Sequence, residues 1–244
     1  MRNSNFSKRI YKEHVKLYRY INDECIFLHL AVPLLKKSLD DIQSKEKKEF
    51  LFPVPKKGKK VFSRREKEEV VELIKRQLTK DLFSKNIVLL ISRMETHLQN
   101  CMRRAIKAYP QKLSILTGEK VVISTPTLIN ASDKEDLLDE IIEQKCSEIM
   151  FLSPQQYIQK FKQVLSIDIP ESLIGRYIEI KAARDLIIHG DGTANHHYLK
   201  KAGDYARAKI GESLSIDEKY YESVVIILKR FAGSIMDNVE KAYC

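Results

Sequence analysis

Apolar side chains recur every three or four residues along most of this chain, which is the spacing of one face of an α-helix. A first helix is predicted over residues 6–48, and proline at position 33 is expected to kink or split it. A second long helix is predicted to begin at Ser63, with Glu66 completing a capping box, and to run to Tyr109 before Pro110 stops it. Further helices are predicted from Ser132, from Ser153-Pro154, from Pro170 to Gly190, and over residues 216–242.

Two segments break the helical pattern. Residues 52–61 contain two prolines, one glycine and four lysines, so they are predicted to form a linker. Residues 110–131 are irregular, and Val121–Ile123 within them is either one short strand or an extended loop. The predicted fold class is therefore all-α: an N-terminal helical extension and Pro/Lys linker over 1–62, then a helical bundle over 63–244 with a small irregular insertion.

Composition agrees with a folded bundle. Hydrophobic residues make up 43% of 244 positions, which is enough to bury a core. The net charge of +10 points to a polyanionic partner without identifying it. Four cysteines lie far apart and form no Cys-x-x-Cys pair, so a disulfide scaffold and a structural zinc site are excluded. The spacings Cys25–His29 and His97–Cys101 each offer only two ligands and favour core packing, so we expect no metal and no cofactor.

No membrane association is expected. The first twenty residues are basic and lack an apolar run, so no secretory signal is predicted. The most apolar stretch, Cys25–Leu35, is about half the roughly 20 residues that a spanning helix needs, and His29 and Pro33 interrupt it. We expect a soluble, reduced and cytoplasmic protein.

The stretch from Ile180 to Gly192 carries the candidate chemistry. Arg184 is predicted to project from the middle of an apolar helical stripe formed by Leu173, Tyr177, Ile180, Ile187 and Ile188. A guanidinium cannot lose its proton, so on an apolar face it needs an anion or an interface cleft. A partner helix that buried the stripe would let two such arginines share one phosphate, which predicts a homodimer.

One step around the same helix, Asp185 and His189 are four residues apart and therefore neighbours. The carboxylate is expected to orient the imidazole and to favour its protonated form. Gly190 follows, at the position where a left-handed cap ends a helix. An arginine for phosphate, an orientable histidine and an open helix end together favour phosphodiester cleavage.

These residues resemble a known family. Arg184-Asp-Leu-Ile-Ile-His189, followed by Gly190, is similar to the Arg-x4-His motif of HEPN domains, in which a polar residue follows the arginine. A second match, Arg9 to His14, lacks the polar residue, the apolar run and the glycine, so we interpret it as coincidence. Residues 88–98, which include Glu95, resemble the Glu-x-x-Leu helix of HEPN branches related to ribonuclease-L-type proteins, and the resemblance extends over about residues 63–244.

The resemblance implies a metal-independent endoribonuclease that acts as a toxin or an anti-phage effector. It implies that His189 assists 2′-hydroxyl attack or protonates the leaving oxygen, that Arg184 holds the scissile phosphate, and that Asp185 orients His189. The expected product is a 2′,3′-cyclic phosphate, and because the 2′-hydroxyl is an internal nucleophile this reaction needs no metal. The implied partners are RNA, a second copy of the chain, and an antitoxin or regulatory protein.

Several interpretations stay open. Lys200-Lys201 and Arg103-Arg104 are candidate RNA contacts, although charge runs are usually solvated faces. Glu95 is more typical of a surface or inter-helix charge than of a site residue. His196-His197 either contact RNA or lie in a polar loop, and the loop is the favoured interpretation. Two other functions compete with cleavage: a non-catalytic HEPN-like dimerisation module that binds RNA or a nucleotide, and an interaction scaffold whose charge serves an acidic partner. Binding without turnover would identify the first of these.

Overall fold

The computed structural model describes residues 2–118, 123–190 and 192–244. Most of the described chain is helical and the only strands within it form one two-stranded sheet, so the predicted all-α class is confirmed. The predicted strand or loop at 121–123 falls largely outside the described residues.

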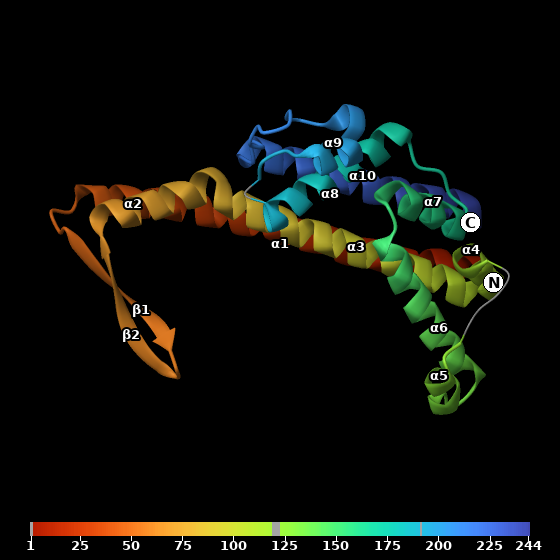
Figure 1. The fold of residues 1–244 in the computed structure, drawn as a ribbon. Coiled ribbons are helices and arrows are strands. Elements are labelled where there is room, and N and C mark those ends of the chain that lie inside the picture. Colours follow the sequence, from red (N-terminus) through yellow and green to blue (C-terminus); the bar gives the residue numbers. More distant parts are fainter. Residues whose placement is uncertain (1, 119–122, 191) are drawn as a thin grey trace.

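Long helices run along the molecule in two layers (Figure 1). Helix α1 (Arg2–Ser44) packs against α3 (Leu82–Ala108), and α10 (Glu218–Tyr243) packs against both. Helix α8 (Glu171–His189) lies on α3 and α10. Buried side chains of α1 and of the helices after residue 66 belong to one continuous core, so the first helix packs as part of the bundle.

Of the two outcomes predicted for Pro33, a kink or a split of the first helix, the split does not occur. Helix α1 continues through Pro33, which lacks the amide hydrogen for one helical bond. Leu28 and Val32 are buried beside it, so packing on α3 and α10 holds the helix together across this position.

The remaining elements are β1 (Glu49–Lys56), β2 (Lys59–Glu66), α2 (Lys67–Arg76), the π-helical turn η1 (Gln77–Asp81), η2 (Pro110–Leu113), α4 (Ser114–Thr117), α5 (Thr125–Asn130), α6 (Lys134–Glu148), η3 (Ile149–Phe151), α7 (Pro154–Leu165), α9 (His196–Ala202) and η4 (Gly203–Tyr205). The predicted helix start at Ser153-Pro154 is confirmed, because Ser153 forms a capping box with Gln156. The start predicted at Ser132 is displaced by one residue, since Asp133 caps α6.

A β-hairpin stands where the sequence predicts a linker. Lys57 and Gly58 both have positive φ, as a two-residue hairpin turn that matches the strand twist requires. That turn makes Lys56 and Lys59 the closing hydrogen-bonded pair, so the prolines at positions 53 and 55 fall where an amide hydrogen would point away from β2. The following helix is capped by Glu66, three residues later than predicted.

A buried carboxylate on α8 binds three side chains from the part of the chain that follows α8. Glu179 is 4% exposed and accepts hydrogen bonds from the hydroxyls of Tyr198 on α9 (2.9 Å) and Tyr220 on α10 (3.2 Å). It also accepts one from Nε of Arg207 (3.0 Å), whose guanidinium lies 3.4 Å from the ring centre of Tyr220. Burial raises the pKa of Tyr198 to about 12, so its hydroxyl keeps the donated proton. The bond from Tyr198 holds α9 beside α8, and the bond from Tyr220 holds α10 there.

Replacing Glu179 is expected to destabilise the fold strongly. Glu179→Ala leaves Arg207 and two tyrosine hydroxyls without their acceptor, and we expect it to lower the free energy of unfolding by about 3 kcal/mol in urea titrations. The control Glu148→Ala, which removes an exposed ion pair with Lys145, is expected to cost less than about 1 kcal/mol. Equal effects of the two substitutions would contradict this role for Glu179.

Candidate functional site

A cavity of about 330 Å³ lies between the end of α8 and the first turns of α9. It is lined by Ala182, Asp185, Leu186, His189, Gly190, Asn195, His197, Tyr198 and Lys201. The structure thus brings together three of the residues singled out in the sequence, Asp185, His189 and Lys201, and adds His197 to them.

The short connection after α8 builds this cavity. Helix α8 ends at His189 as predicted, but Gly190 is extended, and the left-handed conformation falls on Gly192 instead. The chain therefore reverses two residues later than expected. Asn195 then caps α9 by accepting a hydrogen bond from the amide of Tyr198 at 2.9 Å. The reversal lays α9 back along α8, which brings Lys201 to Asp185.

Two imidazoles reach the cavity. His189 is the last residue of α8 and His197 lies in the first turn of α9, and both side chains are exposed. Within the described residues, none of the hydrogen bonds occupies the ring nitrogens of either histidine. Imidazole accepts a proton in its neutral form and donates one in its protonated form, so two imidazoles at one cavity can provide a proton acceptor and a proton donor.

The predicted pair of Asp185 with His189 is not the one that forms. The Asp185 carboxylate accepts from Nζ of Lys201 at 2.9 Å, and Nη1 of Arg184 lies 3.2 Å from it. Two permanent cations are therefore its partners, and a charged donor makes a stronger hydrogen bond to a carboxylate than a neutral imidazole does. Asp185 positions Lys201 in the cavity wall.

The anion that pairs with Arg184 is a carboxylate of the same chain. Its Nη2 atom lies 2.8 and 2.9 Å from the two carboxylate oxygens of Glu95 on α3, and Nζ of Lys181 lies 2.7 Å from the same carboxylate. All three side chains are mostly buried. Glu95, predicted to be a surface or inter-helix charge, is thus an inter-helix counter-ion of the motif arginine. Arg184 reaches the cavity only through Asp185.

The apolar stripe on α8 is covered by the same chain. Leu173, Tyr177 and Ile180 are buried in the core, where Tyr177 stacks on Phe231 of α10 with ring centres 4.6 Å apart. Ile188, expected in this stripe, is exposed. An unburied stripe and an unpaired arginine are therefore no longer reasons to expect a dimer.

The two basic pairs considered as RNA contacts, Arg103-Arg104 and Lys200-Lys201, lie in different parts of the structure. Arg103 forms an ion pair with Glu143 on α6, and Arg104 forms one at 2.5 Å with Glu13 on α1. These arginines lie about 12 Å farther along α3 than Glu95, so they join α3 to its neighbours and do not line the cavity. Lys200 is exposed on α9 beside the cavity-lining Lys201.

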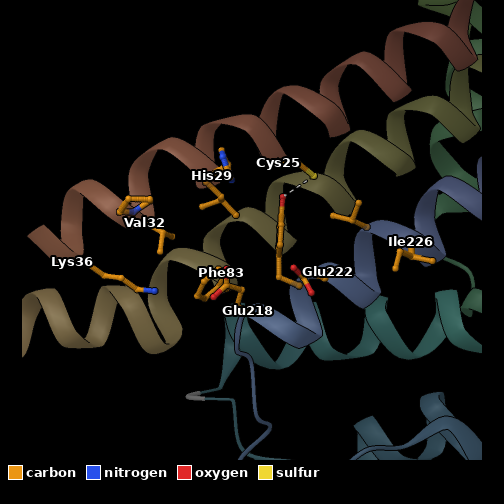
Figure 2. A pocket seen from close by; sticks show the side chains of 12 residues that line it. Cys25, His29, Val32, Lys36, Phe83, Glu218, Glu222 and Ile226 are labelled. Carbon is orange, nitrogen blue, oxygen red and sulfur yellow. Dashed lines mark hydrogen bonds between the residues drawn. The ribbon is translucent and has the colours of Figure 1, made fainter.

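A larger groove of about 500 Å³ lies between α1, α3 and α10 (Figure 2). Its walls are mainly apolar, with Lys36, Glu218 and Glu222 among the residues around it. The dashed line in Figure 2 marks the contact of Cys25 Sγ with the Tyr221 hydroxyl at 3.8 Å. The thiol that sequence spacing pairs with His29 is therefore directed at a tyrosine.

His97 and Cys101, the other histidine–cysteine pair considered as metal ligands, lie in the core, as predicted. His97 and Cys101 are both buried, with Nε2 and Sγ 3.7 Å apart, and burial lowers the pKa of His97 to about 4. In the part of the chain that the structure describes, no group of three histidine, cysteine or acidic side chains is placed to hold a metal ion.

Comparisons with family models, with curated proteins and with solved structures give no match to this chain. The resemblance to HEPN domains therefore rests on the features of the sequence alone. Within the described ranges, none of the helices is both long enough and apolar enough to cross a bilayer.

His197 is the cavity residue that the sequence interpretation missed. The sequence favours a polar loop for it, whereas it lies in the first turn of α9 and lines the cavity at the end of α8. A usable signal was the length of the connection. Only residues 190–195 separate the two helices, and so short a connection places the next helix against the last turns of α8.

Because Arg184 pairs with Glu95, we expect substitutions of these two residues to lower the free energy of unfolding by different amounts. Arg184→Gln leaves Glu95 paired with Lys181, whereas Glu95→Gln leaves two buried cations without their shared anion, so we expect Glu95→Gln to lower the free energy of unfolding more. The double substitution is expected to cost about 1–3 kcal/mol less than the sum of the two, as measured by urea unfolding. Strict additivity would show that the two charges do not interact.

Proposed function

We propose that this chain is a metal-independent endoribonuclease whose reaction takes place in the cavity between α8 and α9. The observation that carries the proposal is that two accessible histidines, His189 and His197, line the same cavity as Lys201. Cleavage of RNA through its own 2′-hydroxyl needs a proton acceptor, a proton donor and a cation for the phosphate, and these three side chains supply them.

The proposed reaction follows from these groups. One imidazole takes the proton of the 2′-hydroxyl while the oxygen attacks phosphorus, and the other imidazole protonates the departing 5′-oxygen. The 2′-oxygen–phosphorus bond forms as the bond to the 5′-oxygen breaks, which gives a 2′,3′-cyclic phosphate and a free 5′-hydroxyl. Lys201 stabilises the negative charge that builds up on the phosphate oxygens. Neither water nor a metal ion is consumed.

Arg184 has a different role in this proposal from the one that the HEPN resemblance implies. Because Glu95 and Asp185 occupy its guanidinium, we assign it as a positioning residue that acts on Lys201 through Asp185. The resemblance supplies the biological part of the proposal: activity as a homodimer, a role as a toxin or anti-phage effector, and an antitoxin or regulatory protein as partner.

Cleavage of end-labelled single-stranded RNA in excess EDTA tests the proposal. We expect the wild-type chain to produce cyclic phosphate ends, and His189→Ala and His197→Ala each to slow cleavage about 100-fold or more. The matched control is His196→Ala, which removes the adjacent exposed histidine that does not line the cavity and is expected to cleave like wild type. Replacing the ribose at the cleaved position by deoxyribose is expected to abolish cleavage there.

Loss of cleavage in EDTA would overturn the proposal, and so would undiminished cleavage by His189→Ala and His197→Ala. Growth arrest on expression, relieved by His189→Ala, is the expected cellular counterpart of a toxin.

A second candidate function is RNA or nucleotide binding without turnover. One observation favours it: the motif arginine and Lys201 are both already paired with carboxylates of this chain, so neither cation stands free for a transition state. Salt-dependent binding by the wild-type chain, with no cleavage under the conditions above, would identify this function.

A further inference from the structure

The hairpin and its flanking residues, 45–67, form a projecting segment that we call the arm (Figure 1). The arm holds ten lysines and arginines against three glutamates, so seven of the ten net positive charges of the chain lie in about a tenth of its length. Strands of eight residues extend about 26 Å, so most of this charge lies well outside the helical body.

The charge is concentrated at the tip. The tip lysines Lys56, Lys57, Lys59 and Lys60 are all exposed, and in the described parts of the chain none of them forms an ion pair. Apolar side chains accompany them on both faces of the two-stranded ribbon. Phe52 and Val54 lie on one face and Phe62 on the other, and all are exposed. Exposed aromatic rings beside unpaired lysines suit a ligand with both phosphates and flat bases.

The arm is poorly suited to strand addition by another protein. The missing amide hydrogens of Pro53 and Pro55 lie along the outer edge of β1, where an added strand would need donors. Lysines at a sheet edge also oppose pairing with a further strand. The arm is anchored only at its base, where Nζ of Lys67 donates to the carbonyls of Gln43 and Lys45 at 2.7 Å.

We propose that the arm binds single-stranded nucleic acid, with the tip lysines on phosphates and Phe52 and Phe62 stacked on bases. This inference rests on the proposed function only in the choice of RNA as the probe. Binding is therefore measured in a His189→Ala background, in which cleavage plays no part, so that failure of the arm and failure of the ribonuclease proposal are separate results.

Fluorescence anisotropy with a labelled single-stranded RNA tests the arm. Replacing the four tip lysines by serine is expected to weaken binding at least tenfold and to reduce the slope of log Kd against log salt by about two to three. Phe62→Ala is expected to weaken binding about tenfold with little change in that slope. Because the arm lies outside the core, thermal unfolding of both variants is expected to match wild type.

The matched control replaces four exposed lysines of the helical body, Lys8, Lys12, Lys134 and Lys241, by serine. It lowers the net charge by the same amount and is expected to keep most of the affinity. Equal loss in the tip and body variants would overturn the proposal, because net charge alone would then explain binding. Binding of the arm to anionic lipid vesicles but not to RNA would overturn it as well.

An independent observation concerns the outer face of α1. Four large apolar side chains there are more than half exposed: Ile26 (56%), Phe27 (53%), Leu30 (60%) and Leu34 (68%). At 100° per residue, Ile26, Leu30 and Leu34 fall on one stripe. Contiguous apolar surface of this kind on a helix is typical of an interface.

Exposed charges continue this stripe at steps of three or four residues in both directions. Arg19 and Asp23 precede the apolar residues, and Lys37 and Asp41 follow them. Among the described residues none of these four side chains forms an ion pair. The order along α1 is therefore positive, negative, apolar, positive, negative.

We infer that a second copy of the chain packs antiparallel on this stripe, with the two-fold axis at Leu30. That arrangement pairs Asp23 with Lys37 of the other copy, and Arg19 with Asp41, whereas a parallel arrangement would set like charges side by side. Helices α8 and α9 lie in the other layer of the molecule (Figure 1). The interface therefore leaves the two cavities apart, unlike the homodimer predicted from the sequence, in which two arginines share one phosphate.

Light scattering coupled to size exclusion tests this interface. Wild type is expected to be a dimer at tens of micromolar and Leu30→Glu a monomer, since the substitution sets two carboxylates together on the axis. Leu128→Glu, at an equally exposed leucine on α5 (59%), is the control and is expected to remain a dimer. Asp23→Lys is expected to weaken the dimer and the added Lys37→Asp to restore it. A monomeric wild type, or a charge-swapped double variant that stays monomeric while folded, would overturn the inference.

Discussion

A charged side chain buried in a helical bundle needs an oppositely charged or hydrogen-bonding partner there. Three charged side chains of α8 have such partners. Glu179 meets Arg207 and two tyrosine hydroxyls, Arg184 meets Glu95, and Asp185 meets Lys201. Each pairing joins α8 to another element, so the same bonds that make burial tolerable also set the positions of α3 and α9. The cavity lies where the last of these pairings brings α9 to the end of α8.

Local signals predicted the helices well. Capping at Ser153, the stop at Pro110 and the length of α8 depend on residues close together in the sequence, and the structure agrees with each within a residue. The hairpin was missed because prolines argue against a strand, and only the pairing register reveals that both face outward. Helix periodicity also failed to distinguish burial by the same chain from burial by a second copy.

The sequence predicted which residues belong to the candidate site but not which side chains form ion pairs with them. Arg184, Asp185 and His189 are adjacent on one helix, so sequence spacing located them. Arg184 pairs with Glu95, 89 residues away, and Asp185 pairs with Lys201, 16 residues away. Helix propensity and periodicity carry no information about such contacts. Neighbours on a helix were therefore assumed to pair, whereas stronger ionic partners from α3 and α9 took their place.

The way the arm is attached has a consequence for how this chain can change. At its base the amide of Lys67 donates to the carbonyl of Lys48, and the core contains none of the side chains of the arm. Insertions, deletions or new residues between those points leave the helical registers untouched. The part of the molecule with the greatest charge is thus the part most free to diverge, while the bundle that bears the cavity stays constrained.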